Sequence, residues 1–242
     1  MRLTVLGKYG TFPAPGGACS GYLLERDGRY VLLDCGNGVM SRLQGVVPIE
    51  RLEAIVLSHL HDDHAGDVRI LKYAVETKRA FGTMTDRIKL YMPREPKRTA
   101  EDLAYAEAFE VSYVDGHTVL EAAGLELRFS PMRHSVETYA ISVGDGSRRM
   151  VYSADTTRHE GLVRFAAGAD LLLCEATIAE TGPVPIPHMT AAEAGETARE
   201  AGVGRLLLTH LWCDESEERC LRAARTAFER TEFVQEMKTY EI

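Results

Sequence analysis

The sequence has no basic excess and no closely spaced pair of cysteines. Its 28 Lys and Arg residues are outnumbered by 36 Asp and Glu residues, and the formal net charge is −8. Such a chain repels phosphate backbones on average, so no long nucleic-acid partner is expected. The five cysteines are scattered, without a CxxC pair. This pattern disfavours a thiolate zinc knuckle or a disulfide framework, and most of the cysteines are expected to pack in the core.

Long hydrophobic runs are also missing. The first ten residues do not have the pattern of a secretory leader, and no apolar stretch approaches the ~20 residues that cross a bilayer. We therefore expect a cytoplasmic protein with no membrane partner. The chain has 242 residues, of which 45% are hydrophobic and 26% are charged, as in an ordinary folded protein. Residues 1–242 are expected to form a single domain.

Apolar runs that indicate strands alternate with stretches of helical periodicity. The run at residues 54–58 is almost continuously apolar, as in a strand covered on both faces. Similar runs lie at 169–177 and 205–210, and the sequence predicts a last strand at 232–242. After Asp67, apolar residues recur at the spacing of a helix, and further helices are predicted at 99–109, 189–201 and 214–229. Two groups of strands separated by helices predict two sheets flanked by helices.

Four metal-binding side chains lie within six residues at the end of the apolar run 54–58. They are His59, His61, Asp63 and His64. A rigid strand end fixes the directions of such side chains, and imidazoles with carboxylates suit zinc, manganese or iron. A single histidine would be weak evidence, but three with an interleaved aspartate indicate a metal site. Asp62 within this segment is expected to face solvent.

The segment resembles the HxHxDH signature of the metallo-β-lactamase superfamily. Later landmarks of that family also appear in order: His134 in SPMRHS, Asp155 in YSADT and His210 in LLLTH. Each of them follows an apolar or strand-like run, so we expect them all at strand ends. The resemblance covers nearly the whole chain. It implies an α+β fold, the αββα sandwich, in which two mixed sheets pack face to face with helices on both outer sides and metals at one edge.

The resemblance also implies a two-metal ligand set. One metal would be bound by His59, His61 and His134, the other by Asp63, His64 and His210, and Asp155 would bridge both. A shared water or hydroxide would act as nucleophile, and Asp63 would orient it or accept its proton. We expect two divalent ions, zinc in the first place, with Mn²⁺ or Fe²⁺ as alternatives. Oxygen-reducing members of the family carry a carboxylate where this chain has His61, so hydrolysis is preferred over redox chemistry.

Two further motifs resemble ribonuclease Z and its relatives: Cys174-Glu-Ala-Thr177 and His188-Met-Thr190. The resemblance implies that His188 lies near the metals and protonates the leaving alkoxide of a phosphodiester. A surface histidine in a Pro-rich loop is the plainer interpretation of the same residue. Glu175 would either orient His188 or belong to a local hydrogen-bond network, and these alternatives stay open.

Two segments near the start of the chain are candidate neighbours of the metals. Asp34 ends the apolar run YVLLD, where the family has a loop-organising aspartate. A contact to a metal ligand and simple turn formation are equally compatible with it. The loop Gly7–Gly17 is expected to border the pocket.

One departure from ribonuclease Z narrows the substrate. Only twenty residues separate His134 from Asp155, which leaves no room for the tRNA-gripping arm of those enzymes. We therefore expect a phosphodiesterase for a small substrate, such as a cyclic nucleotide or a short oligonucleotide. The alternatives are a carbon-centred hydrolase of lactonase, thioesterase or β-lactamase type, a tRNA 3′-processing endonuclease, and a metal-binding module without activity. A homodimer is the default expectation, with residues 81–100 as a candidate contact.

Overall fold

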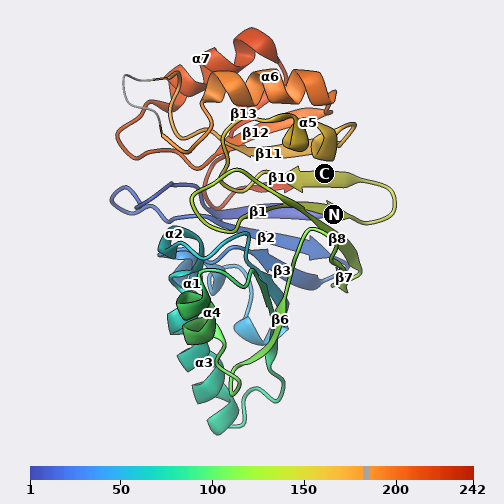
Figure 1. Ribbon diagram of the computed structural model, residues 1–242. Coiled ribbons are helices and arrows are strands. Elements are labelled where there is room, and N and C mark those ends of the chain that lie inside the picture. The colour runs from blue at the N-terminus through green and yellow to red at the C-terminus, as the bar shows by residue number, and fades with distance from the viewer. Residues whose placement is uncertain (182–185) are drawn as a thin grey trace.

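The computed structural model describes residues 1–181 and 186–242, and it arranges them in four layers. Two sheets of seven strands lie between two layers of helices (Figure 1). Helices α1 (Val39–Leu43), α2 (Asp62–Ala65), α3 (Val68–Ala80) and α4 (Lys97–Leu103) lie on the side of the first sheet. Helices α5 (Glu160–Ala166), α6 (Ala191–Ala201) and α7 (Glu217–Ala227) lie on the side of the second. The predicted αββα sandwich is confirmed.

The first sheet has the order β14-β1-β2-β3-β4-β5-β6. Its strands are β14 (Thr239–Glu241), β1 (Arg2–Gly7), β2 (Gly21–Arg26), β3 (Arg29–Leu33), β4 (Leu52–Val56), β5 (Ile88–Met92) and β6 (Phe109–Tyr113). Pairing is antiparallel from β14 to β3 and parallel from β3 to β6.

The second sheet has the order β13-β12-β11-β10-β9-β8-β7. Its strands are β13 (Thr231–Phe233), β12 (Arg205–Thr209), β11 (Leu171–Glu175), β10 (Arg149–Tyr152), β9 (Tyr139–Gly144), β8 (Leu125–Pro131) and β7 (Val119–Ala122). It is parallel from β13 to β10 and antiparallel from β10 to β7. Because parallel strands end at a common edge, the loops that follow them gather there.

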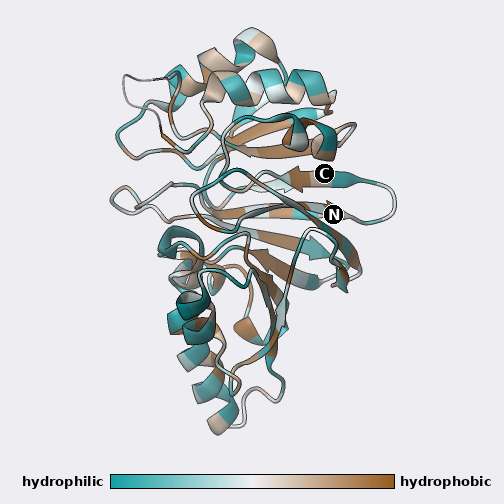
Figure 2. Cartoon of the chain, in the orientation of Figure 1, coloured by the Kyte–Doolittle hydropathy of each residue, from teal (hydrophilic) through white to brown (hydrophobic). Residues whose placement is uncertain are grey.

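Alternation along the strands of the first sheet divides the hydrophobic core in two. In β2, Tyr22 and Leu24 pack in one cluster with Leu127 of the second sheet. Leu23, between them, packs in the other cluster with Leu71 of α3. Figure 2 shows the same division, with apolar strands in the middle and hydrophilic outer faces on the helices. Both faces of the central strands are covered, which explains why the run 54–58 is almost continuously apolar.

Two of the predicted elements are wrong in extent. The helix predicted at 99–109 ends at Leu103, and Phe109 instead begins β6, which pairs in parallel with β5. The last strand predicted at 232–242 is two strands that belong to different sheets. Met237, at φ 63°, lies in the turn between them, where the chain crosses from β12 to β1. Local sequence patterns do not contain the long-range pairing that decides both cases.

The structure also bears on what the composition predicted for the cysteines and for the hydrophobic runs. Four of the five cysteines are buried as expected, whereas Cys213 is partly exposed in the loop after β12. Among the described residues, no helix is both long and apolar enough to traverse a lipid bilayer.

Candidate metal centre

The loop after β4 brings the first four candidate ligands to the sheet edge. His59 lies three residues beyond the end of β4, His61 is the N-terminal cap of α2, and Asp63 and His64 lie within α2. The loop residues His59 and His61 belong to one group of side chains, and the helix residues Asp63 and His64 belong to a second group beside it. The remaining three candidates arrive singly after strands of the second sheet: His134 after β8, Asp155 after β10 and His210 after β12. Their predicted placement at strand ends is confirmed.

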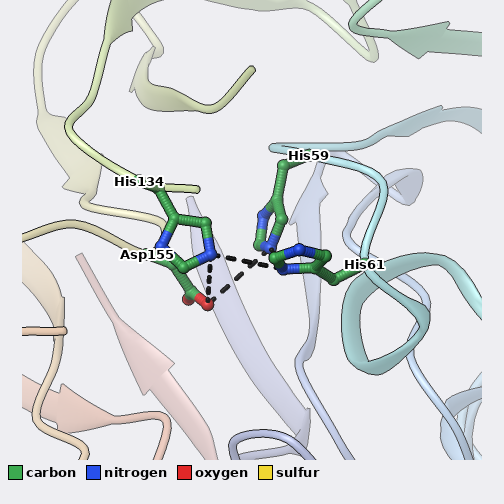
Figure 3. Close-up of side chains that lie close together, drawn as sticks. All are labelled: His59, His61, His134 and Asp155. Carbon is green, nitrogen blue, oxygen red and sulfur yellow. Dashed lines mark hydrogen bonds and ion pairs between the residues drawn. The ribbon is translucent and has the colours of Figure 1, made fainter. Parts of the chain in front are cut away.

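The structure brings His59, His61, His134 and Asp155 together as one group (Figure 3). Nδ1 of His61 lies 3.1 Å from Nε2 of His59 and 3.2 Å from Nε2 of His134. Oδ2 of Asp155 lies 3.7 and 3.8 Å from those two Nε2 atoms. In a tetrahedral site with metal–nitrogen bonds of about 2.0–2.1 Å, ligand atoms are about 3.3 Å apart. The group therefore has the spacing of a zinc-sized site.

A second group consists of Asp63, His64, Asp155 and His210. The two histidine Nε2 atoms lie 3.2 Å apart, and Nε2 of His210 is 3.3 Å from Oδ2 of Asp63. Asp155 places Oδ1 at 3.3 Å from His64 and Oδ2 at 3.3 Å from His210. One carboxylate thus belongs to both groups, as the bridging role requires.

The contacts within these groups suit cations better than hydrogen bonds. Oδ1 of Asp155 is buried and accepts no hydrogen bond from any described residue, and an unpaired buried carboxylate oxygen is costly. Burial lowers the pKa of His59, His61 and His134, so these rings are neutral near pH 7. Neutral imidazole is the form that binds a metal. The donor set therefore fits two divalent cations.

Hydrogen bonds from the outer ring nitrogens hold the histidines in place. Nδ1 of His64 lies 2.8 Å from Oδ2 of Asp34, and Nδ1 of His134 lies 3.1 Å from the carbonyl oxygen of Pro187. A pure acceptor on the outer nitrogen fixes the proton there and directs the lone pair of the other nitrogen inward. Nδ1 of His59 and of His210 have hydroxyl partners, Ser58 at 3.1 Å and Thr177 at 3.1 Å.

Asp34 is buried under the second group. Its carboxylate accepts hydrogen bonds from the Ser58 backbone N–H at 2.7 Å, the Ser58 hydroxyl at 2.8 Å and the Tyr152 hydroxyl at 2.9 Å, besides contacting His64. Asp34 also adopts φ 55°, a turn conformation. Both interpretations left open by the sequence therefore apply: the residue forms the turn and orients a candidate ligand.

Positive φ values gather around this centre. Asp34 at 55°, Ala154 at 52° and His210 at 57° all occupy the left-handed region, which costs a non-glycine residue about 1 kcal/mol or more. Gly10 packs against the His210 ring, where a Cβ would lie 2.5 Å from Cε1. The next residue, Thr11, donates its backbone N–H to Oδ2 of Asp63 at 2.7 Å. The loop Gly7–Gly17 therefore borders the centre as predicted.

His188 lies beside both groups rather than on an isolated surface loop. Its Nδ1 is 3.2 Å from Oε2 of Glu175 and 3.8 Å from Oδ2 of Asp155, and its ring stacks on His210 with centroids 5.2 Å apart. Burial lowers the pKa of His188, but the hydrogen bond and charge of Glu175 outweigh it and raise the pKa to about 9. Glu175 also accepts hydrogen bonds from the Thr156 N–H and the Thr177 hydroxyl. It therefore both contacts His188 and belongs to a buried network.

The chain matches the Beta-lactamase superfamily domain over residues 29–211. It belongs to the beta-lactamase superfamily. It is 35% identical to the probable metallo-hydrolase YhfI of Bacillus subtilis over 229 residues, 94% of each chain. The crystal structure of YhfI superposes with a TM-score of 0.95 over 99% of this chain and 98% of that one. The predicted enzyme class, a metal-dependent hydrolase, is confirmed with the family.

More distant members of the superfamily include ribonuclease Z of Halorubrum lacusprofundi, which is 28% identical over 87% of this chain and 86% of that protein. A diphosphatase from the PhnP family shares the fold, with a TM-score of 0.76 at 22% identity over 100% of this chain and 97% of that chain. The predicted likeness to ribonuclease Z is confirmed.

Several residues that support the candidate ligands were not identified from the sequence. Ser58, Tyr152 and Thr177 contact Asp34, His59 or His210 from the ends of β4, β10 and β11. Ser58 directly precedes the predicted metal cluster, and Thr177 is the last residue of the motif Cys174-Glu-Ala-Thr177, so only their position in the sequence offered a signal. Tyr152 is 118 residues from Asp34, and no local pattern distinguishes it from an apolar core residue.

Proposed function

We propose that this enzyme is a phosphodiesterase that hydrolyses small phosphodiesters, a cyclic nucleotide or a short oligonucleotide. The seven candidate ligands would hold two divalent ions, Zn²⁺ in the first place, with Mn²⁺ or Fe²⁺ as alternatives. When bound, such ions lower the pKa of water and neutralise charge on a phosphate group. The remaining tasks, orientation of water and protonation of the leaving oxygen, belong to side chains of this chain.

The contact between His188 and Glu175 carries the proposal. Hydrolysis of a phosphodiester expels an alkoxide, which needs a proton. Glu175 holds Nδ1 of His188 at 3.2 Å, so the other ring nitrogen is left to donate to the leaving oxygen. Glu175 is thus a positioning residue, and His188 is the general acid. Asp63, fixed by the Thr11 N–H, is proposed to orient the attacking water or accept its proton.

The segment between His134 and Asp155 supports the proposal of a small substrate. Strands β9 and β10 occupy it as a hairpin, with a short turn at residues 145–148. A tRNA-gripping arm would have to be inserted there. The acidic net charge of −8 agrees with a small substrate rather than a long nucleic acid. Relatives named ribonuclease Z support phosphodiester chemistry at the shared site.

The test is a substrate panel with the purified protein loaded with Zn²⁺ or Mn²⁺. We expect hydrolysis of bis-p-nitrophenyl phosphate and of cyclic nucleotides, and little turnover of lactones, thioesters and β-lactams. His188→Ala should lower kcat by about 10²–10⁴ while metal content stays at two per chain. His117→Ala is the matched control, because His117 lies exposed in the turn before β7.

Other results of the substrate panel would assign a different function. Turnover confined to lactones, thioesters or β-lactams would establish carbon-centred hydrolysis, and cleavage confined to precursor tRNA would establish the endonuclease. Silence across the panel with two metals bound would leave a binding module. The cytoplasmic location and the homodimer stay predictions, which fractionation and light scattering would check.

A further inference from the structure

Two segments of the chain lie side by side at the metal centre, residues 8–12 near the N-terminus and residues 210–212 after β12. The Gly10 N–H donates to the Leu211 carbonyl and the Leu211 N–H donates to the Lys8 carbonyl, both at 2.9 Å. In Figure 1 the first segment belongs to the blue loop that projects beyond β1 on the side of α2, the helix that carries two candidate ligands. The two segments therefore form one part of the edge of the metal centre.

Phe12 is held close to the candidate ligands by the residues before it. Gly10 packs so closely on the ring of His210 that a Cβ would lie 2.5 Å from Cε1. Thr11, at φ 58°, donates its backbone N–H to Oδ2 of Asp63 at 2.7 Å. The Phe12 N–H donates back to the Gly10 carbonyl at 2.8 Å. The backbone of Phe12 is therefore one residue away from a direct contact to a candidate ligand.

Trp212 approaches the same centre from the second sheet. It lies two residues after His210, a candidate ligand whose φ of 57° turns the chain at the end of β12. The Trp212 N–H donates to the Thr177 carbonyl at 3.0 Å, and the Thr177 hydroxyl lies 3.1 Å from Nδ1 of His210. The Trp212 carbonyl accepts the Glu215 N–H at 2.9 Å. These bonds fix the position of Trp212 beside His210.

Both aromatic side chains are left in contact with water. Phe12 is 52% exposed, and Trp212, the only tryptophan of the chain, is 42% exposed. Full burial of such a side chain removes about 150–250 Å² from water, a gain that the fold leaves partly unused at these two positions. Binding sites for small molecules combine such apolar surface with a few polar groups, here the candidate metal ligands. The two exposed rings at the edge of the metal centre therefore indicate a surface that a ligand covers.

The size of this surface favours a small aromatic group over another protein. A stable protein interface buries ~800 Å² on each partner, and two half-exposed rings supply only a fraction of that area. Aromatic side chains stack on nucleobases of every kind, because each base has a π face. The proposed substrate carries such a base a short distance from its phosphate.

We propose that Phe12 and Trp212 bind the base of the nucleotide substrate by stacking while its phosphate lies at the metal centre. The inference rests on the proposed function, because it names the part of the phosphodiester that sets specificity. Stacking reads no hydrogen-bond pattern, so all the common bases are accepted, and purines bind more tightly than pyrimidines because their rings are larger. A phosphodiester with an aliphatic group in place of the base loses this contact.

Equilibrium binding to the zinc-loaded protein tests the two rings without turnover. Adenosine 5′-monophosphate and ribose 5-phosphate carry the same phosphate and differ in the base. We expect the nucleotide to bind at least about tenfold more tightly in calorimetry, and to quench the fluorescence of Trp212, which no other tryptophan obscures. Phe12→Ala and Trp212→Ala should each lower the affinity for the nucleotide by about fivefold or more and leave that for ribose 5-phosphate unchanged. Trp212→Phe retains a ring and should retain most of the preference.

Phe81→Ala is the matched control, because Phe81 is 81% exposed just after α3 and the substitution is the same. It should leave both affinities unchanged. Three outcomes would overturn the inference: equal affinity of the two ligands for the wild type, an unchanged preference in both alanine variants, or equal weakening of both ligands in those variants. Loss of a dimer in light scattering, together with equal affinity of the two ligands, would assign the rings to a contact between two copies of the chain instead.

Failure of the proposed function looks different. A preference for the nucleotide that depends on Phe12 and Trp212, together with no hydrolysis of any phosphodiester, would refute the phosphodiesterase and keep the base site. Hydrolysis of cyclic adenosine monophosphate with an unchanged kcat/KM in both alanine variants would refute the base site and keep the phosphodiesterase. If both hold, the two variants raise KM for this substrate with little change in kcat, as expected for binding energy that is equal in the ground and transition states.

Discussion

The two halves of the molecule contribute to the candidate metal centre in different ways. The N-terminal half supplies His59, His61, Asp63 and His64 from one loop and one short helix. The C-terminal half supplies three ligands singly, from the ends of three strands. Yet the distances within each group are alike, at 3.1 to 3.8 Å for contacts across the halves and within them. The parallel strands of both sheets place their ends accurately enough to substitute for proximity in sequence.

We expect the largest loss of metal affinity and turnover from a change at Asp155, the residue that belongs to both groups of candidate ligands. Asp155→Asn replaces one carboxylate oxygen by an amide that donates instead of accepting. Both oxygens face candidate ligands: Oδ1 faces the second group, and Oδ2 faces both groups. We expect metal affinity and turnover to fall by more than the ~100-fold that loss of an outer partner can cost. Elemental analysis after gel filtration and hydrolysis of bis-p-nitrophenyl phosphate would measure this. A variant that keeps two metals and full activity contradicts the shared role of Asp155.

A matched pair in one group tests whether closeness in sequence matters. His61 comes from the loop and His134 from the end of β8, but their ring nitrogens lie 3.2 Å apart. We expect His61→Ala and His134→Ala each to reduce bound zinc from two ions to one, because position in space decides ligation. If His134→Ala retained both ions, the N-terminal loop alone would hold that metal and the comparison between the halves would fail.

A smaller effect is expected for the residue that orients His64. Asp34→Asn keeps the shape of the side chain but weakens the acceptor for Nδ1 of His64, which should lower metal affinity by about 10–100-fold. Competition with a chelator would measure it. Asp62→Asn is the control in the ligand loop, since its side chain is 85% exposed, and it should leave affinity unchanged. Equal affinities in the two variants would show that Asp34 only forms its turn.

The smallest effect concerns the hairpin that sets the spacing between His134 and Asp155. Hydrogen bonds from the Arg148 and Ser147 N–H groups lower the pKa of Asp145 below its usual value. Its charged form therefore stabilises the fold above the unfolded pKa of about 3.9, and this contribution disappears as the pH falls through the lower folded pKa. Asp145→Asn should reduce Tm slightly at pH 7, by an amount that shrinks toward pH 2. A difference in Tm that grows at acidic pH would contradict this assignment.

The sequence predicted the ligands better than the elements that connect them. His59 to His64 form a dense pattern with a chemical meaning, and His134, Asp155 and His210 follow recognisable strands. Tyr152 contacts Asp34 across the two sheets, and Thr177 contacts His210 between the neighbouring strands β11 and β12. Periodicity encodes neither contact. Phe109 shows the same limit, because helical spacing continued up to it while pairing with β5 made it a strand residue.

The crossing of the chain near Met237 has a mechanical consequence. The segment after β12 gives one strand to each sheet, β13 at the border of the second and β14 at the border of the first. Partial opening of either sheet would displace the border strand of the other, because the five residues 234–238 that connect β13 to β14 are too few to absorb the movement. The sandwich should accordingly lose both sheets in one cooperative transition, and with them the paired cluster of imidazoles at their common rim.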